Sequence, residues 1–279
     1  MDKLSSVLTA FRPTASSVSC QALVRSSSGV SSSLVLTAES SYWLYLVTGQ
    51  VELKAQVGGD IHLAQGDGIW LAAGLTLEAL VDGDLSEATL LVCEFDFGSR
   101  ALNPLLDLAG QWVKVTAGDE IAASLAPLNQ LLLSECLQPR CGSQVVVARL
   151  AEAYLVQMLR LFMQTQKIHV GLLAGLSDAK LARALVAMHE SPDAPWQVSS
   201  LAEKAGMSRS AFSQLFKRTM AMTPMNYLTL WRMRLAGQRL KQGERNIALL
   251  SLQMGYQSEA AFRRSFKKVM GVAPGAMSR

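Results

Sequence analysis

Two groups of polar and basic residues in the last third of the chain carry side chains that can bind a polyanion. Within each group, the spacing places the members on one face of a helix. Lysine and arginine pair with phosphates, and arginine, serine and glutamine also form hydrogen bonds with the edges of bases. The first group is Arg209, Ser210, Ser213, Gln214 and Lys217, and the second is Glu259, Arg263, Arg264 and Lys267. These residues predict a surface for nucleic acid.

The charges of the chain are divided unequally between its two ends. Residues 177–279 contain 16 Lys and Arg against 6 Asp and Glu, whereas residues 1–176 contain 10 against 16. Cations on a protein supply much of the sequence-independent affinity for DNA, so a basic end joined to an acidic one favours a polyanion-binding domain. A basic surface that is merely solvated is the alternative.

Both groups lie in two copies of one motif. Matching residues recur at a constant separation of 50 positions: Ser208 and Ser258, Phe212 and Phe262, Phe216 and Phe266, Pro224 and Pro274. Two copies make a duplicated motif and not a solenoid, which needs at least three repeats to bury a continuous core. Each copy predicts a helix, a tight turn and a second helix.

In the first copy we expect a short helix over 201–205, capped by Ser199 or Ser200. Gly206 suits the turn because glycine tolerates a left-handed backbone, and Ser208 suits the cap of the next helix. The regular placement of the turn and the cap predicts that the polar group is displayed on the second helix of the copy.

The two helix-turn-helix units are expected over 199–218 and 247–269, with Gly255 and Ser258 as turn and cap of the second. A helix over 224–242 joins them, and at about 1.5 Å per residue it is roughly 28 Å long. This is close to the ~34 Å between successive major-groove faces on one side of B-DNA. One chain could therefore contact two adjacent major-groove segments.

A purely structural bundle of helical hairpins is the alternative. The glycine turns, serine caps, basic faces and duplication disfavour it.

The segments SLAEKAGMSRSAFSQLFKRTM and MGYQSEAAFRRSFKKVMGVAP resemble the DNA-binding domain of AraC/XylS-type transcription regulators. The resemblance implies a double-stranded DNA partner, and RNA polymerase as a further partner if the output is activation. It assigns base contacts to Ser210, Ser213, Gln214, Glu259, Ala260, Arg263 and Arg264. Ser251 and the pair Met277-Ser278 depart from the family pattern, which puts stability in doubt more than binding.

The front half is expected to be an all-β sandwich. Apolar runs of about five to eight residues alternate with glycines such as Gly58 and Gly83, the spacing of hairpins and short strands. The pattern, with a Gly66-Asp67 turn and a corner at Ala73-Gly74, resembles the cupin sensor domain of many AraC-type regulators. We expect a cupin-like barrel over about 1–118.

The same segment lacks the ligands of a metal-binding cupin. Between residues 41 and 97 the one histidine is His62, and Leu77 stands where a later histidine would be expected. We therefore predict no metal, no cofactor and no catalytic residues. We then expect that the barrel mouth holds a small-molecule pocket, whose lining residues are unknown, or that the sandwich serves only for contact. A metal-dependent cupin enzyme with an accessory DNA-binding domain is the disfavoured alternative.

Helical spacing of apolar residues predicts an antiparallel hairpin from 119–137 and 143–164. Apolar residues beyond one face suggest a homodimer contact, although a hairpin wholly buried in its own chain is nearly as well supported. The expected organisation is a regulatory domain over 1–166, a linker over 167–176 and a DNA-binding domain over 177–279. This organisation is compatible with control of the regulator by a small molecule or by dimer contacts. It is also compatible with a dimer that needs no effector.

Four cysteines, Cys20, Cys93, Cys136 and Cys141, form no CxxC pattern and are expected to be reduced structural thiols. Cys136 and Cys141 flank a predicted turn, so a redox switch between them is the alternative. The longest apolar runs are far below the roughly 20 residues of a membrane span, and the start lacks a secretory apolar stretch. We expect a cytoplasmic protein that does not bind membranes.

Overall fold

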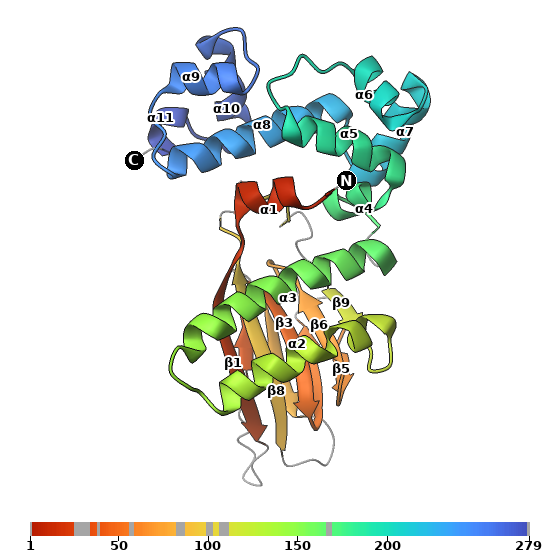
Figure 1. Cartoon of the computed structure of the whole chain (residues 1–279), viewed down its shortest axis with the longest axis vertical. Helices are drawn as coiled ribbons and strands as arrows, with labels where there is room; N and C mark the ends of the chain where they lie inside the picture. Colours follow the sequence, from red (N-terminus) through yellow and green to blue (C-terminus); the bar gives the residue numbers. More distant parts are fainter. Residues whose placement is uncertain are drawn as a thin grey trace. The chain divides into compact units, whose positions relative to one another are not determined.

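The computed structural model describes residues 2–24, 34–37, 40–55, 59–81, 87–98, 103–105, 112–165 and 169–277. Gly58, Gly83 and residues 166–168 of the expected linker lie outside them. The chain forms two compact units (Figure 1). The β unit comprises the described parts of 13–97 and 108–161, and the helical unit comprises those of 1–12, 98–107 and 162–279.

The β unit contains two antiparallel sheets. One sheet has the order β1 (Thr14–Val24), β8 (Glu87–Asp96), β3 (Ser41–Thr48), β6 (Gly68–Leu71) and β9 (Trp112–Val115). The other has the order β2 (Leu34–Leu36), β7 (Leu77–Val81), β4 (Gln50–Ala55) and β5 (Ile61–Ala64). This arrangement confirms the predicted cupin-like, two-sheet fold.

The core of the β unit lies between the two sheets, because side chains alternate between the faces of each strand. On β8, Leu90 and Val92 belong to this apolar core, together with Leu44 and Leu46 on β3. Leu77, at the position where a metal-binding cupin would be expected to place histidine, is also in the core and 3% exposed. Leucines and valines thus fill the space between the sheets.

A helical hairpin of α2 (Glu120–Leu137) and α3 (Ser143–Thr165) lies along the outer face of the β1-β8-β3-β6-β9 sheet (Figure 1). The rings of Trp43 on β3 and Tyr154 on α3 are 5.6 Å apart between centroids, and both side chains are buried. The hairpin confirms the predicted element, because its apolar stripe covers a sheet face that would otherwise be exposed.

Cysteines from the sheet and the hairpin meet at this interface. All four are free, and Cys136 on α2 interacts with Cys20 on β1. Burial, followed by the interaction with Cys136, raises the pKa of Cys20 to about 11, and Cys141 is exposed. The neighbour of Cys136 on the sheet is therefore Cys20, which no local pattern indicates.

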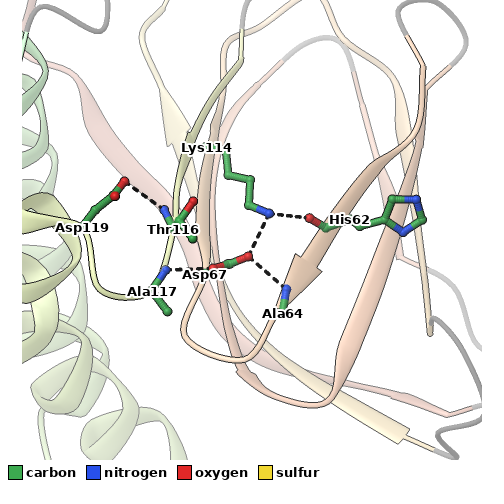
Figure 2. Close-up of polar contacts among 7 residues, drawn as sticks. All are labelled: His62, Ala64, Asp67, Lys114, Thr116, Ala117 and Asp119. Atoms are coloured by element: carbon green, nitrogen blue, oxygen red, sulfur yellow. Dashed lines mark hydrogen bonds and ion pairs between the residues drawn. The ribbon is translucent and has the colours of Figure 1, made fainter.

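The turn between β5 and β6 is tied to the strand that leads into the hairpin (Figure 2). The buried carboxylate of Asp67 accepts hydrogen bonds from the backbone N–H groups of Ala64 (3.0 Å) and Ala117 (2.8 Å), and pairs with Lys114 Nζ at 2.9 Å. Lys114 also donates to the carbonyl oxygen of His62 at 2.7 Å. Asp67 therefore holds the end of β9, just before α2, against the β5–β6 turn.

The helical unit contains the following helices in chain order. They are α1 (Ser5–Phe11), α4 (Leu172–Ser177), α5 (Ala179–Glu190), α6 (Val198–Ala205), α7 (Arg209–Met220), α8 (Pro224–Lys241), α9 (Ile247–Gln253), α10 (Glu259–Met270) and α11 (Pro274–Met277). The order confirms an all-helical C-terminal part in which two helix-turn-helix units are joined by a long helix, α8.

The structure differs from the expected linker over 167–176 in its second half. Residues Leu172–Ser177 form α4, which is buried and packs against α5 and α7. A Cβ atom on Gly175 would lie 2.5 Å from the Met220 sulfur, so this glycine permits close helix packing and does not break the helix. Composition alone made α4 resemble a linker, because it is short and contains glycine.

The first helix also differs from its expected place in the barrel. Residues Ser5–Phe11 form α1, which belongs to the helical unit and packs against α5 and α8. Phe11 lies edge-on to Trp231 with 5.3 Å between ring centroids, and Val7 is fully buried. The partners of α1 are far away in the sequence, so its local pattern could not indicate them.

Candidate nucleic-acid interface

The first helix-turn-helix unit consists of α6, the turn at Gly206 and α7. Gly206 has φ +67°, a left-handed conformation that suits glycine, and Ser208 Oγ accepts a hydrogen bond from Ala211 N at 3.3 Å. Both predictions for these residues are confirmed. The predicted start of α6 was wrong: the helix begins at Val198, and Ser200 in its first turn accepts from Gln197 N at 3.1 Å.

Two phenylalanines set the direction of α7. Phe212 and Phe216 are both fully buried, and the ring of Phe216 lies 5.8 Å from Tyr227 on α8. Because one face of α7 is held in the core, the opposite face is displayed to solvent. That face carries Arg209, Ser210, Gln214 and Lys217, all exposed, and the half-buried Ser213.

Local hydrogen bonds already engage both serines on this face, through different partners. Ser213 Oγ donates to the carbonyl oxygen of Arg209 at 2.9 Å, whereas Ser210 Oγ lies 3.4 Å from the hydroxyl of Ser208. A hydroxyl that donates to its own helix still has lone pairs that can accept. Ser213 is thus set to accept a hydrogen bond from a ligand.

The second unit repeats this construction in α9, the turn at Gly255 and α10. Gly255 has φ +74°, and Ser258 Oγ accepts from Ala261 N at 3.3 Å. Phe262 and Phe266 are fully buried in a core shared with α8 and α9. Ser251, one of the departures from the family pattern, is buried but satisfied, because its hydroxyl donates to Ala248 O at 2.8 Å.

The exposed face of α10 differs from that of α7 in charge and in pairing. Arg263 Nε donates to Glu259 Oε1 at 2.6 Å, an ion pair along one helix turn. Ala260, Arg264 and Lys267 are exposed, and within the described residues the structure records no partner for Arg264. Arg264 is therefore the arginine on this face whose donors are available to a ligand without breaking an ion pair.

The long helix α8 connects the two units. Pro224 occupies its first turn, Thr223 Oγ1 accepts from Asn226 N at 3.3 Å, and the helix ends at Lys241 ahead of Gly243. The predicted helix over 224–242 is thus reproduced to within one residue. Its half-buried Arg232, which sequence reasoning did not single out, contacts the loop that leads into the first unit and Tyr256 of the second.

The described residues of the β unit do not form a group of metal-binding side chains. His62 on β5 is exposed and lies 4.0 Å from Glu52, and no three His, Cys, Asp or Glu side chains among the described residues gather as a metal site. A cavity of about 350 Å³ lies outside the barrel, between β1 and the start of α3. Nor does any described helix combine the length and apolarity that crossing a membrane requires.

Two family models match the chain. A helix-turn-helix domain model matches residues 201–279, and a cupin model matches residues 2–164. The matched segments contain α7, α10 and the described strands of the β unit. Fold and interface together define a DNA-binding transcription regulator with a cupin-like N-terminal domain.

The chain belongs to the AraC-like transcription regulators. A relative from Streptomyces lividans carrying that name is 33% identical over 230 residues, which cover 82% of this chain and 69% of the relative. Another from Streptomyces antibioticus is 32% identical over 232 residues, covering 83% and 73%. The crystal structure of fatty-acid-bound ToxT from Vibrio cholerae aligns over 93% of both chains with 11% identity and a TM-score of 0.40.

Proposed function

We propose that both recognition helices of this regulator, α7 and α10, enter successive major-groove segments of one operator. The observation that carries the proposal is that two buried phenylalanine pairs turn two polar helix faces outward. Each face presents donors and acceptors of the kind that contact bases and phosphates. The ten residues assigned to these faces are the proposed DNA contacts.

The two helices are proposed to contact different bases. Small polar groups, Ser210, Ser213 and Gln214, characterise α7, whereas α10 presents Arg264 beside the Glu259–Arg263 ion pair. Arginine suits bidentate contact with guanine, and glutamine suits adenine. We therefore expect an asymmetric half-site about 17 to 20 base pairs long, since two groove contacts lie one turn apart.

Salt dependence tests the proposed phosphate contacts. Affinity for a promoter duplex, measured by mobility shift at several salt concentrations, should fall steeply as salt rises because bound counterions are released. A duplex of unrelated sequence should bind more weakly, with a similar dependence of affinity on salt concentration. Affinity that ignores salt would contradict binding through these basic faces.

Control is proposed to run through the β unit, by dimer contacts or by a small molecule. Exposed apolar side chains gather where α2 ends and α3 begins, at Leu137, Val145 and Val146, and such a patch favours contact with a second copy. A thermal-shift screen against metabolites separates effector control from an effector-independent dimer, because a ligand of the folded state raises its apparent stability.

We propose no enzymatic activity, a cytoplasmic location, and contact with RNA polymerase if the regulator acts as an activator. The relatives are named as transcription regulators, which supports this assignment. Metal analysis of the purified chain tests it against the enzyme alternative, since stoichiometric iron, zinc or manganese would favour a catalytic cupin. Transcription in vitro from a bound promoter tests activation.

A further inference from the structure

Arg232, in the middle of α8, holds the loop that leads into the first helix-turn-helix unit. Its Nε donates to the carbonyl oxygen of Pro192 at 2.6 Å, and its Nη2 donates to that of Ala194 at 2.9 Å. Both carbonyls belong to the segment between α5 and α6. Because a guanidinium presents its donors in a rigid plane, the two bonds fix the position of this loop on α8.

The same guanidinium also lies against the second unit. The Arg232 Cζ lies 5.9 Å from the ring centroid of Tyr256, which follows the turn glycine of that unit. A Cβ atom on Gly255 would lie 2.5 Å from the carbonyl oxygen of Asp193 and 2.8 Å from Arg232 Nη2. The turn of the second unit therefore packs directly on the loop that precedes the first unit, and Arg232 contacts both.

These contacts are continuous with the supports of both units. The ring of Tyr256 lies edge-on to Phe262, a buried anchor of α10, with 5.6 Å between centroids. On the other side, the Trp196 indole N–H donates to the carbonyl oxygen of Ser191 at 2.8 Å, which stiffens the loop before α6. A displacement of one unit against the other must therefore break bonds around Arg232.

We infer that Arg232 is a positioning residue that locks the two helix-turn-helix units at one separation and angle. We call Pro192, Asp193, Ala194, Arg232, Gly255 and Tyr256 the Arg232 clamp. The clamp makes DNA affinity depend on the spacing between the segments that α7 and α10 contact. This inference rests on the proposed function, because both recognition helices must bind one DNA molecule.

The test changes the spacing in the DNA. The full chain selects duplexes from a random-sequence library, and two base pairs are then inserted between the two contacted segments of the selected duplex. The insertion rotates one segment by roughly 70° and shifts it by about 7 Å. We expect the wild type to bind the lengthened duplex at least about tenfold more weakly, and Arg232→Ala to lose less than about threefold.

Two variants on α8 complete the comparison. Arg239→Ala removes the same charge from the same helix, but Arg239 bonds Gln253 Oε1 on α9 at 2.6 Å and not the loop before α6, so this variant should keep the tenfold penalty. Arg232→Lys keeps the positive charge but loses the planar pair of donors that binds two carbonyls. Its loss of affinity for the lengthened duplex should therefore be as small as that of Arg232→Ala. A wild type indifferent to the insertion, or an Arg232→Ala that keeps the full penalty, overturns the inference.

A measurement without DNA separates the clamp from the proposed function. The amides of Trp196 and Tyr256 are hydrogen-bonded to Ala194 O and Ser251 O. Their hydrogen exchange should be at least about tenfold faster in Arg232→Ala and unchanged in Arg239→Ala. Unchanged exchange in Arg232→Ala refutes the clamp. Failure of the wild type to select any DNA contradicts the proposed function, while the exchange rates still decide whether the clamp exists.

Discussion

Arg264 and Lys217 are exposed cations on the two recognition helices, and they differ in what they can bind. Arginine can contact guanine through two donors, whereas lysine is a mobile point charge. Arg264→Ala should cost about 1–3 kcal/mol on the preferred duplex and relax base preference at one position. Lys217→Ala should weaken all duplexes about equally and reduce the salt slope by about one. Competition binding against single-base operator variants measures both effects.

A comparison variant at another of the proposed DNA contacts is Arg263→Ala. Arg263 is already paired with Glu259 at 2.6 Å, so its loss removes an ion pair as well as any DNA contact. If Arg264→Ala and Lys217→Ala both leave affinity and preference unchanged, the assignment of the exposed faces is wrong.

His189 makes the helical unit sensitive to acid. Burial lowers its pKa to about 3, and its ring stacks on Trp231 and bonds Tyr227 Oη at 2.6 Å. The unfolded chain takes up a proton near pH 6.5 while the folded one does not, so stability falls as the pH drops below 6.5. We expect a loss of about 2 kcal/mol between pH 7 and pH 5, measured by denaturant unfolding.

The pH dependence should be smaller in His189→Gln, whatever the absolute stability of that variant. His62→Gln, which replaces an exposed histidine on β5, is the control. Equal slopes in wild type and His189→Gln would mean that His189 is not the group that titrates.

At the scale of elements, Asp67 attaches the strand before α2 to the barrel. Burial opposes its ionisation, but hydrogen bonds from Ala117, Lys114 and Ala64 outweigh burial and lower the pKa of Asp67. The pair therefore contributes stability above the unfolded carboxyl value, near pH 4, and this is lost as pH falls through the lower folded pKa.

Replacing Asp67 with asparagine should destabilise the β unit at neutral pH by about 2–3 kcal/mol, since it removes the charge that compensates Lys114. Urea unfolding of the full chain measures the change. Asp119→Asn is the control: its half-buried carboxylate accepts a solvent-exposed hydrogen bond from Thr116 N at 3.2 Å, and the change should cost less than about 1 kcal/mol. Equal losses in the two variants would contradict a special role for Asp67.

At the scale of the whole molecule, the turn end of the α2–α3 hairpin is the proposed dimer contact. Val145 is 66% exposed and Leu137 63%, so substitution with glutamate should leave the fold unchanged. In a dimer interface, the same change buries a charge, and we expect Val145→Glu to raise the dimer dissociation constant at least about tenfold. Sedimentation equilibrium measures it.

Val35→Glu provides the comparison. Val35 is similarly exposed, at 60%, but it lies on β2, in the sheet that the hairpin does not cover. This variant should remain as dimeric as the wild type. A dimer that survives the double change Leu137→Glu and Val145→Glu would place the contact elsewhere, and a monomeric wild type would exclude it.

The sequence by itself determined the elements whose causes are local. Ser208 and Ser258 cap helices through bonds to amides three positions away, and Phe212 and Phe216 share a face because the helix repeats every 3.6 residues. Duplication made these signals easy to recognise. The exposed faces of α7 and α10 followed from the same periodicity, and so did the hairpin over α2 and α3.

Only the tertiary structure decided which distant segments meet. Arg232 bonds carbonyls 38 and 40 positions away, and Asp67 bonds an amide 50 positions away. Neither α1 nor α4 carries a local sign of its partners in the helical unit. Backbone carbonyls occur at every residue and amide N–H groups at every residue except proline, so no spacing of side-chain types marks the ones that Arg232 or Asp67 will bind.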